Sequence, residues 1–373
     1  MSETRERAAE LDRSLDMVLL AMVLFLLAFG VVMVLSASGI MAEKFWGDKY
    51  FFFKRQVLYA LAGLGALGAA YAAPREFWYR HTYVWLLLAF ALLAVTLVPG
   101  IGVAAGGARR WLRLGPASIQ PLEPAKVALV FYLAYFFSTK QDKVKTFSVG
   151  FLPPVAMTGA MCLLLLAQPD FGGAVLLAGI LFLMSLVGGT RFLYLGSSLL
   201  FGLAGAWALV VSSPYRFKRL AAFLDPFENA RTVGYQIVQS LYAFGSGGVA
   251  GAGLGAGRQK LLFLPEAHND FIMAVAGEEL GFLGVTLFFA CMGVLLWRAF
   301  AVALRQKDDR DRLLGAGMAI IICLGAVLNM AVVLGSAPPK GVPMPFVSYG
   351  GSHVVVACFC AGILLNLSKG EKA

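Results

Sequence analysis

The chain has 373 residues, of which 60% are hydrophobic and only 14% charged, and its formal net charge is +10. Soluble domains carry about 25% charged residues, so this composition excludes an ordinary water-soluble protein and indicates an integral membrane protein. The five cysteines lie in apolar segments and only three histidines are present, so a His/Cys metal site is not expected.

Runs of roughly 17 to 25 apolar residues predict about ten membrane-spanning helices. The first run follows a mixed-charge tail, 1–16, and is too long for the apolar core of a cleaved signal peptide. We therefore expect an all-α polytopic membrane protein, with a single membrane domain over 1–373 and a large extracytoplasmic loop, 212–269, between the seventh and eighth helices. The predicted spans lie near 17–36, 56–73, 82–98, 124–138, 150–167, 171–188, 192–211, 270–297, 313–335 and 347–367.

The distribution of basic residues predicts which side of the membrane each loop occupies. An even number of spans places both termini on one side, and cytoplasmic termini put most Lys and Arg residues of the short loops inside. The long outer loop is an exception, because it is also cationic. Its basic residues are Arg216, Lys218, Arg219, Arg231, Arg258 and Lys260. Charge alone leaves two interpretations open, a solvated loop or a site for an anionic ligand.

Two outer elements carry ionisable residues at the start of a predicted helix. Glu123 and Lys126 are three residues apart at the start of the fourth span, where Pro124 suits the first turn. An ionisable pair at that depth suggests a function, although an ion pair that locks two helices explains it equally well. Asp170, in the turn QPDFGG, is better explained as the N-cap of the sixth span.

The long loop ends in two unusual stretches. Seven glycines from Gly245 to Gly257 follow no strand, so they predict a bent segment that can approach a ligand rather than a dinucleotide-binding fingerprint. The stretch LPEAHNDFIMAVAGEELGFLG, 264–284, then begins the eighth span, with Asn269 or Asp270 as its expected N-cap. Glu278 and Glu279 lie deeper, where a carboxylate must pair, be protonated or face a polar cavity.

These outer segments place several cations on the same side of the membrane as Asp170 and Asp270. Cations can hold an anionic group and a carboxylate can accept a proton, which suggests a site for an amphiphilic anion at the outer interface. A transporter could present the same features.

Three motifs give the chain a resemblance to a known family. They are RRWLRLGPASIQPLEPAK (109–126), LPEAHNDFIMAVAGEELGFLG (264–284) and PKGVPMPFVSYGGS (339–352). In this order, and with the ten-span layout, they resemble the SEDS family of FtsW, RodA and SpoVE. PEAH and the preceding GLGAGRQK are more similar to the FtsW branch than to the RodA branch.

The resemblance implies a multi-pass peptidoglycan glycosyltransferase of the bacterial cytoplasmic membrane. It would polymerise lipid II at the outer face, with inversion and release of undecaprenyl pyrophosphate, in cell division more than in elongation. The implied partners are a cognate class B penicillin-binding protein, which is a transpeptidase, and other divisome or elongasome membrane proteins, but no nucleic acid. The implied chemistry requires no cofactor, with a divalent cation (Mg²⁺ or Mn²⁺) as a further candidate and no metal ligand assigned.

The resemblance also implies roles for particular residues. Asp270 corresponds to the family's essential acid, and we assign it as the catalytic general base by analogy with inverting glycosyl chemistry. The residues expected to bind substrate are Arg110, Trp111, Glu123, Lys126, Arg216, Lys260, Glu266, His268 and Ser348. The chain departs from the family pattern at Asn269, Pro124 and His353, and the last of these leaves the lining near Ser352 uncertain.

Two other functions use the same features. A lipid II flippase would need ionisable groups along a path to the inner face, for which Glu278, Glu279 and Asn329 leave some room, whereas most such groups cluster outward. A scaffold that recruits a penicillin-binding protein would need no chemistry at Asp270.

Overall fold

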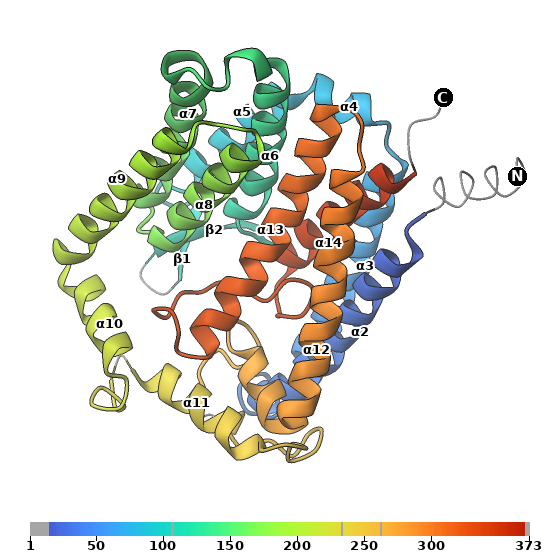
Figure 1. Ribbon diagram of the computed structural model, residues 1–373. Coiled ribbons are helices and arrows are strands. Elements are labelled where there is room, and N and C mark those ends of the chain that lie inside the picture. The colour runs from blue at the N-terminus through green and yellow to red at the C-terminus, as the bar shows by residue number, and fades with distance from the viewer. Residues whose placement is uncertain (1–14, 106–107, 116, 233, 262, 370–373) are drawn as a thin grey trace, which may run out of the picture.

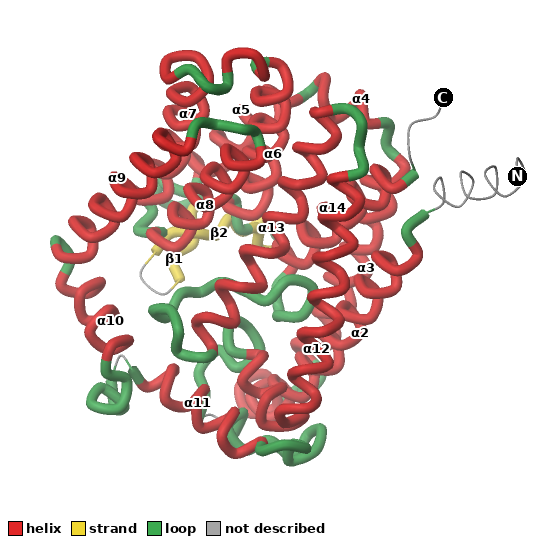
Figure 2. Tube along the Cα trace, viewed as in Figure 1, coloured by secondary structure: helices red, strands yellow, loops and turns green. Residues whose placement is uncertain are grey.

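In the computed structural model the chain forms a bundle of long helices with a small sheet beside them (Figure 1, Figure 2). The structure describes residues 15–369 apart from 106–107, 116, 233 and 262. The helices are α2 (Met17–Trp46), α3 (Phe51–Ala72), α4 (Arg75–Arg80), α5 (Thr82–Val95), α6 (Leu122–Thr139), α7 (Leu152–Ala167), α8 (Phe171–Val187), α9 (Phe192–Val211), α10 (Pro214–Leu224), α11 (Tyr235–Gly247), α12 (Ile272–Leu304), α13 (Asp309–Val333) and α14 (Gly351–Ser368). Two short helical turns, η1 (Gln141–Lys143) and η2 (Phe147–Phe151), connect α6 to α7.

Each predicted span coincides with one long helix, so the mostly helical, multi-pass architecture is confirmed. Six helical segments among the described residues are long and apolar enough to cross a membrane: α2, η2 continuous with α7, α9, α12, α13 and α14. The helices α5 and α8 are apolar but shorter. The number of ten crossings therefore stays a prediction. The predicted outer loop, 212–269, contains α10 and α11.

The two ends of the described chain lie together at one end of the bundle. The Asp16 amide donates to the Ser368 hydroxyl at 3.2 Å, and Arg298, near the end of α12, pairs with the Asp16 carboxylate at 2.6 Å. In Figure 1, α11 lies at the opposite end, which we call the distal end. Termini on a common side agree with the predicted topology, while their cytoplasmic location stays a prediction.

The core of the bundle lies around α13. In its most apolar stretch, 72% of the residues are buried, compared with 6% in the peripheral helix α9. Around this core, α3 and α14 pack so closely that a Cβ on Gly362 would lie 2.4 Å from the Leu67 carbonyl oxygen. Small residues allow such contacts between membrane helices, and this one packs the second half of α14 directly against α3.

A small three-stranded antiparallel sheet accompanies the predicted helical architecture. Its strands are β1 (Gly102–Ala105), β2 (Ala108–Leu114) and β3 (Ala117–Ile119). Along β1, Val103 pairs with Trp111 and Ala104 pairs with Arg109, so Arg110 is an extra residue in β2. Such a β-bulge changes the direction of a side chain. The bulge therefore gives the Arg110 side chain a direction that differs from the regular alternation along β2.

Helix α12 is interrupted at Gly281, where φ is 65° and ψ is −168°. The glycine-rich segment 248–253 pairs with the interruption through four backbone hydrogen bonds. They are Ala252 N to Glu278 O, Gly253 N to Glu279 O, Phe282 N to Gly248 O and Leu283 N to Val249 O, at 2.9 to 3.1 Å. A Cβ on Gly251 would lie 2.3 Å from the Glu279 carbonyl oxygen. The glycines thus approach a helix backbone.

The expected N-cap of the eighth span is wrong. Helix α12 begins at Ile272 with Phe271 in the N-cap position, and no side chain caps it. Asp270 therefore lies in the loop that precedes α12, and its carboxyl group is not used as a cap.

Candidate functional site

The carboxyl group of Asp270 is half-buried beside the segment that follows α13. Its Oδ2 atom lies 3.0 Å from the position that a Cβ on Gly341 would occupy, so a side chain there would press against the carboxyl group. Burial raises the pKa of Asp270 to about 7, the Glu266 carboxylate acts in the same direction, and Arg110 acts in the opposite one. A carboxyl group with that pKa exchanges a proton near neutral pH, as a general base requires.

Arg110 connects this loop to a second acid, Asp170. The Nε atom of Arg110 lies 3.5 Å from Oδ1 of Asp170, and its Nη2 donates to the Pro169 carbonyl at 3.3 Å. The same Oδ1 atom accepts a hydrogen bond from the Gly173 amide at 3.0 Å, so the predicted N-cap role of Asp170 is confirmed. Asp170 thus holds Arg110 at the start of α8.

Further cations gather around Phe171, the first residue of α8. The Lys340 Nζ atom lies 5.1 Å from the Phe171 ring centroid, and the Arg216 guanidinium lies 5.6 Å from it. Arg219 donates to the Pro339 carbonyl at 3.3 Å, which brings α10 against the segment after α13. Burial lowers the pKa of Lys340 and Asp170 raises it. Arg110, Arg216, Arg219 and Lys340 form the cation cluster.

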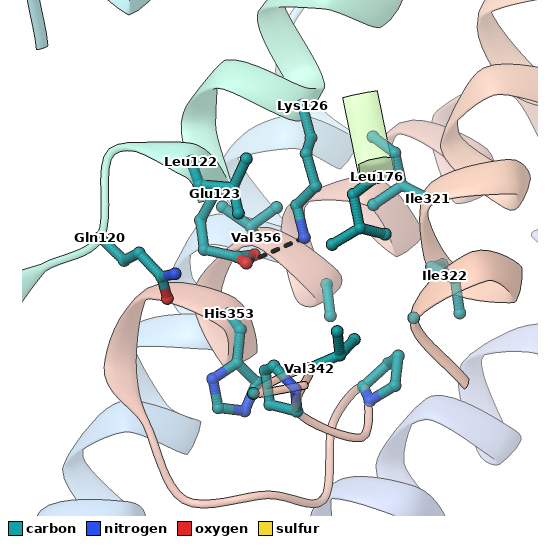
Figure 3. Close-up of a pocket in the computed structure, with 15 residues that line it drawn as sticks. Gln120, Leu122, Glu123, Lys126, Leu176, Ile321, Ile322, Val342, His353 and Val356 are labelled. Carbon is teal, nitrogen blue, oxygen red and sulfur yellow. Dashed lines mark hydrogen bonds and ion pairs between the residues drawn. The ribbon is translucent and has the colours of Figure 1, made fainter. Parts of the chain in front are cut away.

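The pair Glu123 and Lys126 lines a small pocket that Gly341 also lines (Figure 3). The Lys126 Nζ atom lies 2.9 Å from Glu123 Oε1, and Glu123 is buried. The pocket has about 30 Å³ of free space, enough for one or two water molecules. His353 from α14 lines it as well. The ion pair therefore lies in the same pocket as the glycine nearest to the Asp270 carboxyl group, and Pro124 lies in the first turn of α6 as predicted.

Lys260, predicted to bind substrate, takes part in a buried ion pair, and its role in substrate binding stays a prediction. Its Nζ atom pairs with Glu279 Oε1 at 2.5 Å and donates to Ser36 Oγ at 2.9 Å, and both charged side chains are almost fully buried. The neighbouring Glu278 accepts hydrogen bonds from the Arg258 and Gln259 amides, at 2.8 and 3.0 Å. Of the predicted alternatives for these two glutamates, pairing is therefore the one that the structure shows.

Ser348 is likewise engaged inside the protein. It has no exposed surface, and its Oγ atom donates to the Asn269 carbonyl at 2.7 Å and accepts from the Met344 amide at 2.9 Å. It holds the loop that carries Asp270, so we remove it from the substrate contacts.

Three other predicted site residues have different settings. His268 is buried against the Phe52 and Tyr349 rings, at 4.5 and 5.4 Å, and burial lowers its pKa to about 4, so it is neutral at pH 7. Glu266 is exposed, with a positive φ of 58°, and its carboxylate accepts a hydrogen bond from the side-chain Nδ2 group of Asn269. Trp111 is half-buried in β2.

Sequence reasoning missed Lys340 as a site residue. It lies inside the motif PKGVPMPFVSYGGS beside Gly341, and that position within a motif is the signal from which it could have been found. Among the described residues, no group of three or more His, Cys, Asp or Glu side chains is placed to hold a metal ion.

Comparisons with known proteins agree with this arrangement. The model of the FtsW/RodA/SpoVE family, described as cell cycle protein, matches residues 17–373. A protein of Trichlorobacter lovleyi, named "Probable peptidoglycan glycosyltransferase FtsW", is 45% identical over 96% of this chain and 94% of its own length. The stage V sporulation protein E of Bacillus subtilis is 40% identical over 95% of this chain and 97% of its own length.

Two solved structures are similar over almost their whole length. One, described as showing structural coordination of polymerization and crosslinking by a peptidoglycan synthase complex, gives a TM-score of 0.77 at 28% identity over 95% of this chain and 98% of that one. The crystal structure of the rod shape determining protein RodA of Thermus thermophilus gives a TM-score of 0.70 at 27% identity, over 96% and 98% of the two chains.

Proposed function

The chain belongs to the FtsW/RodA/SpoVE family of cell cycle proteins, and on that basis we propose that it is a peptidoglycan glycosyltransferase that polymerises lipid II. The name of its FtsW relatives supports this activity and a role in cell division. The single observation that carries the proposal is the Asp270 carboxyl, whose pKa is about 7 and which lies within the electrostatic influence of Arg110, a member of the cation cluster.

Asp270 and the cation cluster suit the two halves of the reaction. Lipid II is a disaccharide-peptide on a polyprenyl pyrophosphate, so the acceptor is a sugar hydroxyl and the leaving group is an anion. In an inverting displacement one general base takes the proton of the attacking 4-hydroxyl group, and we assign that role to Asp270. The cation cluster stabilises the negative charge that grows on the departing pyrophosphate.

The Glu123–Lys126 pair has a supporting role in this proposal. Lys126 lines the pocket that Gly341 also lines, and its charge is balanced there by the Glu123 carboxylate, so the pair offers hydrogen-bonding groups rather than net charge. A divalent cation would need the phosphates of the substrate as ligands, because the described residues supply no cluster of their own. Arg110, Trp111, Glu123, Lys126, Arg216, Lys260, Glu266 and His268 stay in the set of predicted substrate contacts.

The membrane side and the partner belong to the same proposal. We place both termini in the cytoplasm and Asp270 with the cation cluster at the outer face of the bacterial cytoplasmic membrane, where lipid II is used. A cognate class B penicillin-binding protein would supply crosslinking. The similar structure of a synthase complex that couples polymerization and crosslinking supports a partner of that kind.

Labelled lipid II tests the proposal. The purified protein with its penicillin-binding partner is expected to convert it into a ladder of glycan strands on a gel, and a muramidase is expected to digest that ladder. In proteoliposomes, movement of lipid II across the bilayer without any polymer would instead support a flippase. Equal polymerisation by the partner alone would support a scaffold.

A further inference from the structure

Three consecutive carbonyl groups around Asp270 each accept one hydrogen bond from α13 or the segment after it. The Tyr349 amide donates to His268 O at 2.9 Å, and Ser348 Oγ donates to Asn269 O at 2.7 Å. The third donor is the Nδ2 group of Asn329, which donates to the carbonyl oxygen of Asp270 at 2.8 Å. The backbone on both sides of the Asp270 side chain is therefore held from one direction.

Asn329 holds a second segment at the same time. Its Nδ2 group also donates to the Val342 carbonyl at 2.8 Å, so both of its hydrogens are used. Both partners are carbonyl oxygens, which fixes the orientation of the amide, because its oxygen could not bond to either of them. Asn329 is 1% exposed in the last part of α13, the most buried of the six candidate membrane spans among the described residues.

The two segments that Asn329 joins meet at the Asp270 carboxyl group. A Cβ on Gly341, next to Val342, would lie 3.0 Å from Oδ2 of Asp270, and Lys340 precedes Gly341 beside Phe171. A change in the spacing of these two segments would therefore move the carboxyl group relative to the cation cluster.

We propose that Asn329 is a positioning residue, which sets the placement of the Asp270 carboxyl group relative to Gly341 and Lys340 by bridging the two segments that carry them. This inference rests on the proposed function, in which Asp270 is the general base. A purely packing role explains the side chain poorly, since Oδ1 of Asn329 has no partner among the described residues. A leucine would fill the same volume without burying an unpaired oxygen.

Two variants separate positioning from folding. Asn329→Leu removes both donors at similar volume, and Asn329→Asp keeps the shape while replacing the donor group by an acceptor. Both are expected to lower the polymerisation rate about 10- to 100-fold, as misplacement of a reacting group does, while KM for lipid II changes less than about two-fold. Both are also expected to move the pH midpoint of the rate away from its wild-type value.

The control is Ser240→Ala, which removes another buried hydrogen bond to α13. Ser240 Oγ donates to the Val333 carbonyl at 2.6 Å, near the end of α13 and outside the contacts of Asp270. This variant is expected to keep the wild-type rate and pH midpoint. If the Asn329 variants also keep both, or if they lose activity only in proportion to lost folded protein, the proposal is overturned. If Asn329→Leu does not accumulate, Asn329→Asp alone decides.

A second readout does not depend on polymerisation. Labelling of the Asp270 carboxyl group by a carbodiimide and an amine, followed by peptide mass spectrometry across a pH series, reports its protonation directly. The Asn329 variants are expected to shift this profile, and Ser240→Ala is not. A wild-type protein that makes no polymer would contradict the proposed function, while the labelling profiles would still decide the role of Asn329, with unchanged profiles refuting it.

Discussion

Lys260 and Glu279 form an ion pair of 2.5 Å inside the protein, with 4% and 0% of their side chains exposed. Ser36 donates to the same carboxylate at 2.7 Å, and the Gly255 amide donates to it at 3.1 Å. The pair therefore ties α2, the glycine-rich segment and the first part of α12 together. Because the loop that carries Asp270 leads directly into this part of α12, the pair belongs to the framework of the site.

Removing one member of that pair should destabilise the protein. Lys260→Met leaves the Glu279 carboxylate buried without its counter-ion, a loss of about 3 to 5 kcal/mol in the free energy of unfolding. Fluorescence-detected thermal unfolding in detergent is expected to show a lower Tm. The double variant Lys260→Met, Glu279→Gln should recover part of the loss, and equal Tm values for wild type and Lys260→Met would contradict this role.

The rate of polymerisation should follow the protonation of Asp270. A base works in its deprotonated form, so the rate should rise with pH through a single midpoint near 7. Glu266→Gln should lower this midpoint, because it removes a negative charge that raises the pKa of Asp270. Arg110→Gln should raise it for the opposite reason. Initial rates between pH 5.5 and 9, a range chosen to bracket about 7, measure these shifts, and a flat profile would contradict the assignment.

Lys340 should matter for the leaving group more than for binding of the sugar. Lys340→Met removes one cation from beside Phe171 and Asp170, and we expect a fall in kcat of about 10²- to 10³-fold. The control is Arg113→Gln, at an exposed position in β2, which should change kcat by less than about three-fold. Similar losses in the two variants would point to general electrostatics.

The contact between the glycine-rich segment and α12 should tolerate no side chain. Gly251 has φ of 81° and a Cβ there would lie 2.3 Å from the Glu279 carbonyl oxygen, so Gly251→Ala should destabilise the protein by about 1 to 3 kcal/mol. In Gly245→Ala, which meets nothing within 4 Å, stability should be unchanged or slightly higher. Thermal unfolding of both variants distinguishes a packed segment from a loose one, for which the two would behave alike.

Apolar runs predicted where the long helices lie, because membrane helices must satisfy their own backbone hydrogen bonds over a continuous stretch. They did not predict the ends. Helix α2 continues to Trp46 rather than ending near residue 36, and it passes through SASG although serine and glycine are weak helix formers, with Ser38 Oγ bonded to the Val34 carbonyl at 2.6 Å. The N-cap expected at Asn269 or Asp270 failed because Phe271 takes that position and the carboxyl group of Asp270 remains in the loop.

The site was predictable only in part, because its residues meet through contacts far apart in sequence. The Glu123–Lys126 pair and the Asp170 cap follow from spacing of a few residues and were found. The bulge at Arg110, the Lys260–Glu279 pair and the placement of Lys340 depend on the tertiary fold, so no local pattern carries them. The glycine-rich stretch predicted a close approach of the backbone, but it did not predict that α12 is the element approached.

The most direct test of the account is polymerisation of labelled lipid II by Asp270→Asn at pH 8, with the partner present. Asparagine keeps the size of the side chain and removes only its ability to take up a proton. The control is Asp225→Asn, at an exposed acid whose carboxylate accepts from the Glu228 amide. The account predicts a glycan ladder from wild type and Asp225→Asn and none from Asp270→Asn, and a full ladder from Asp270→Asn would contradict it.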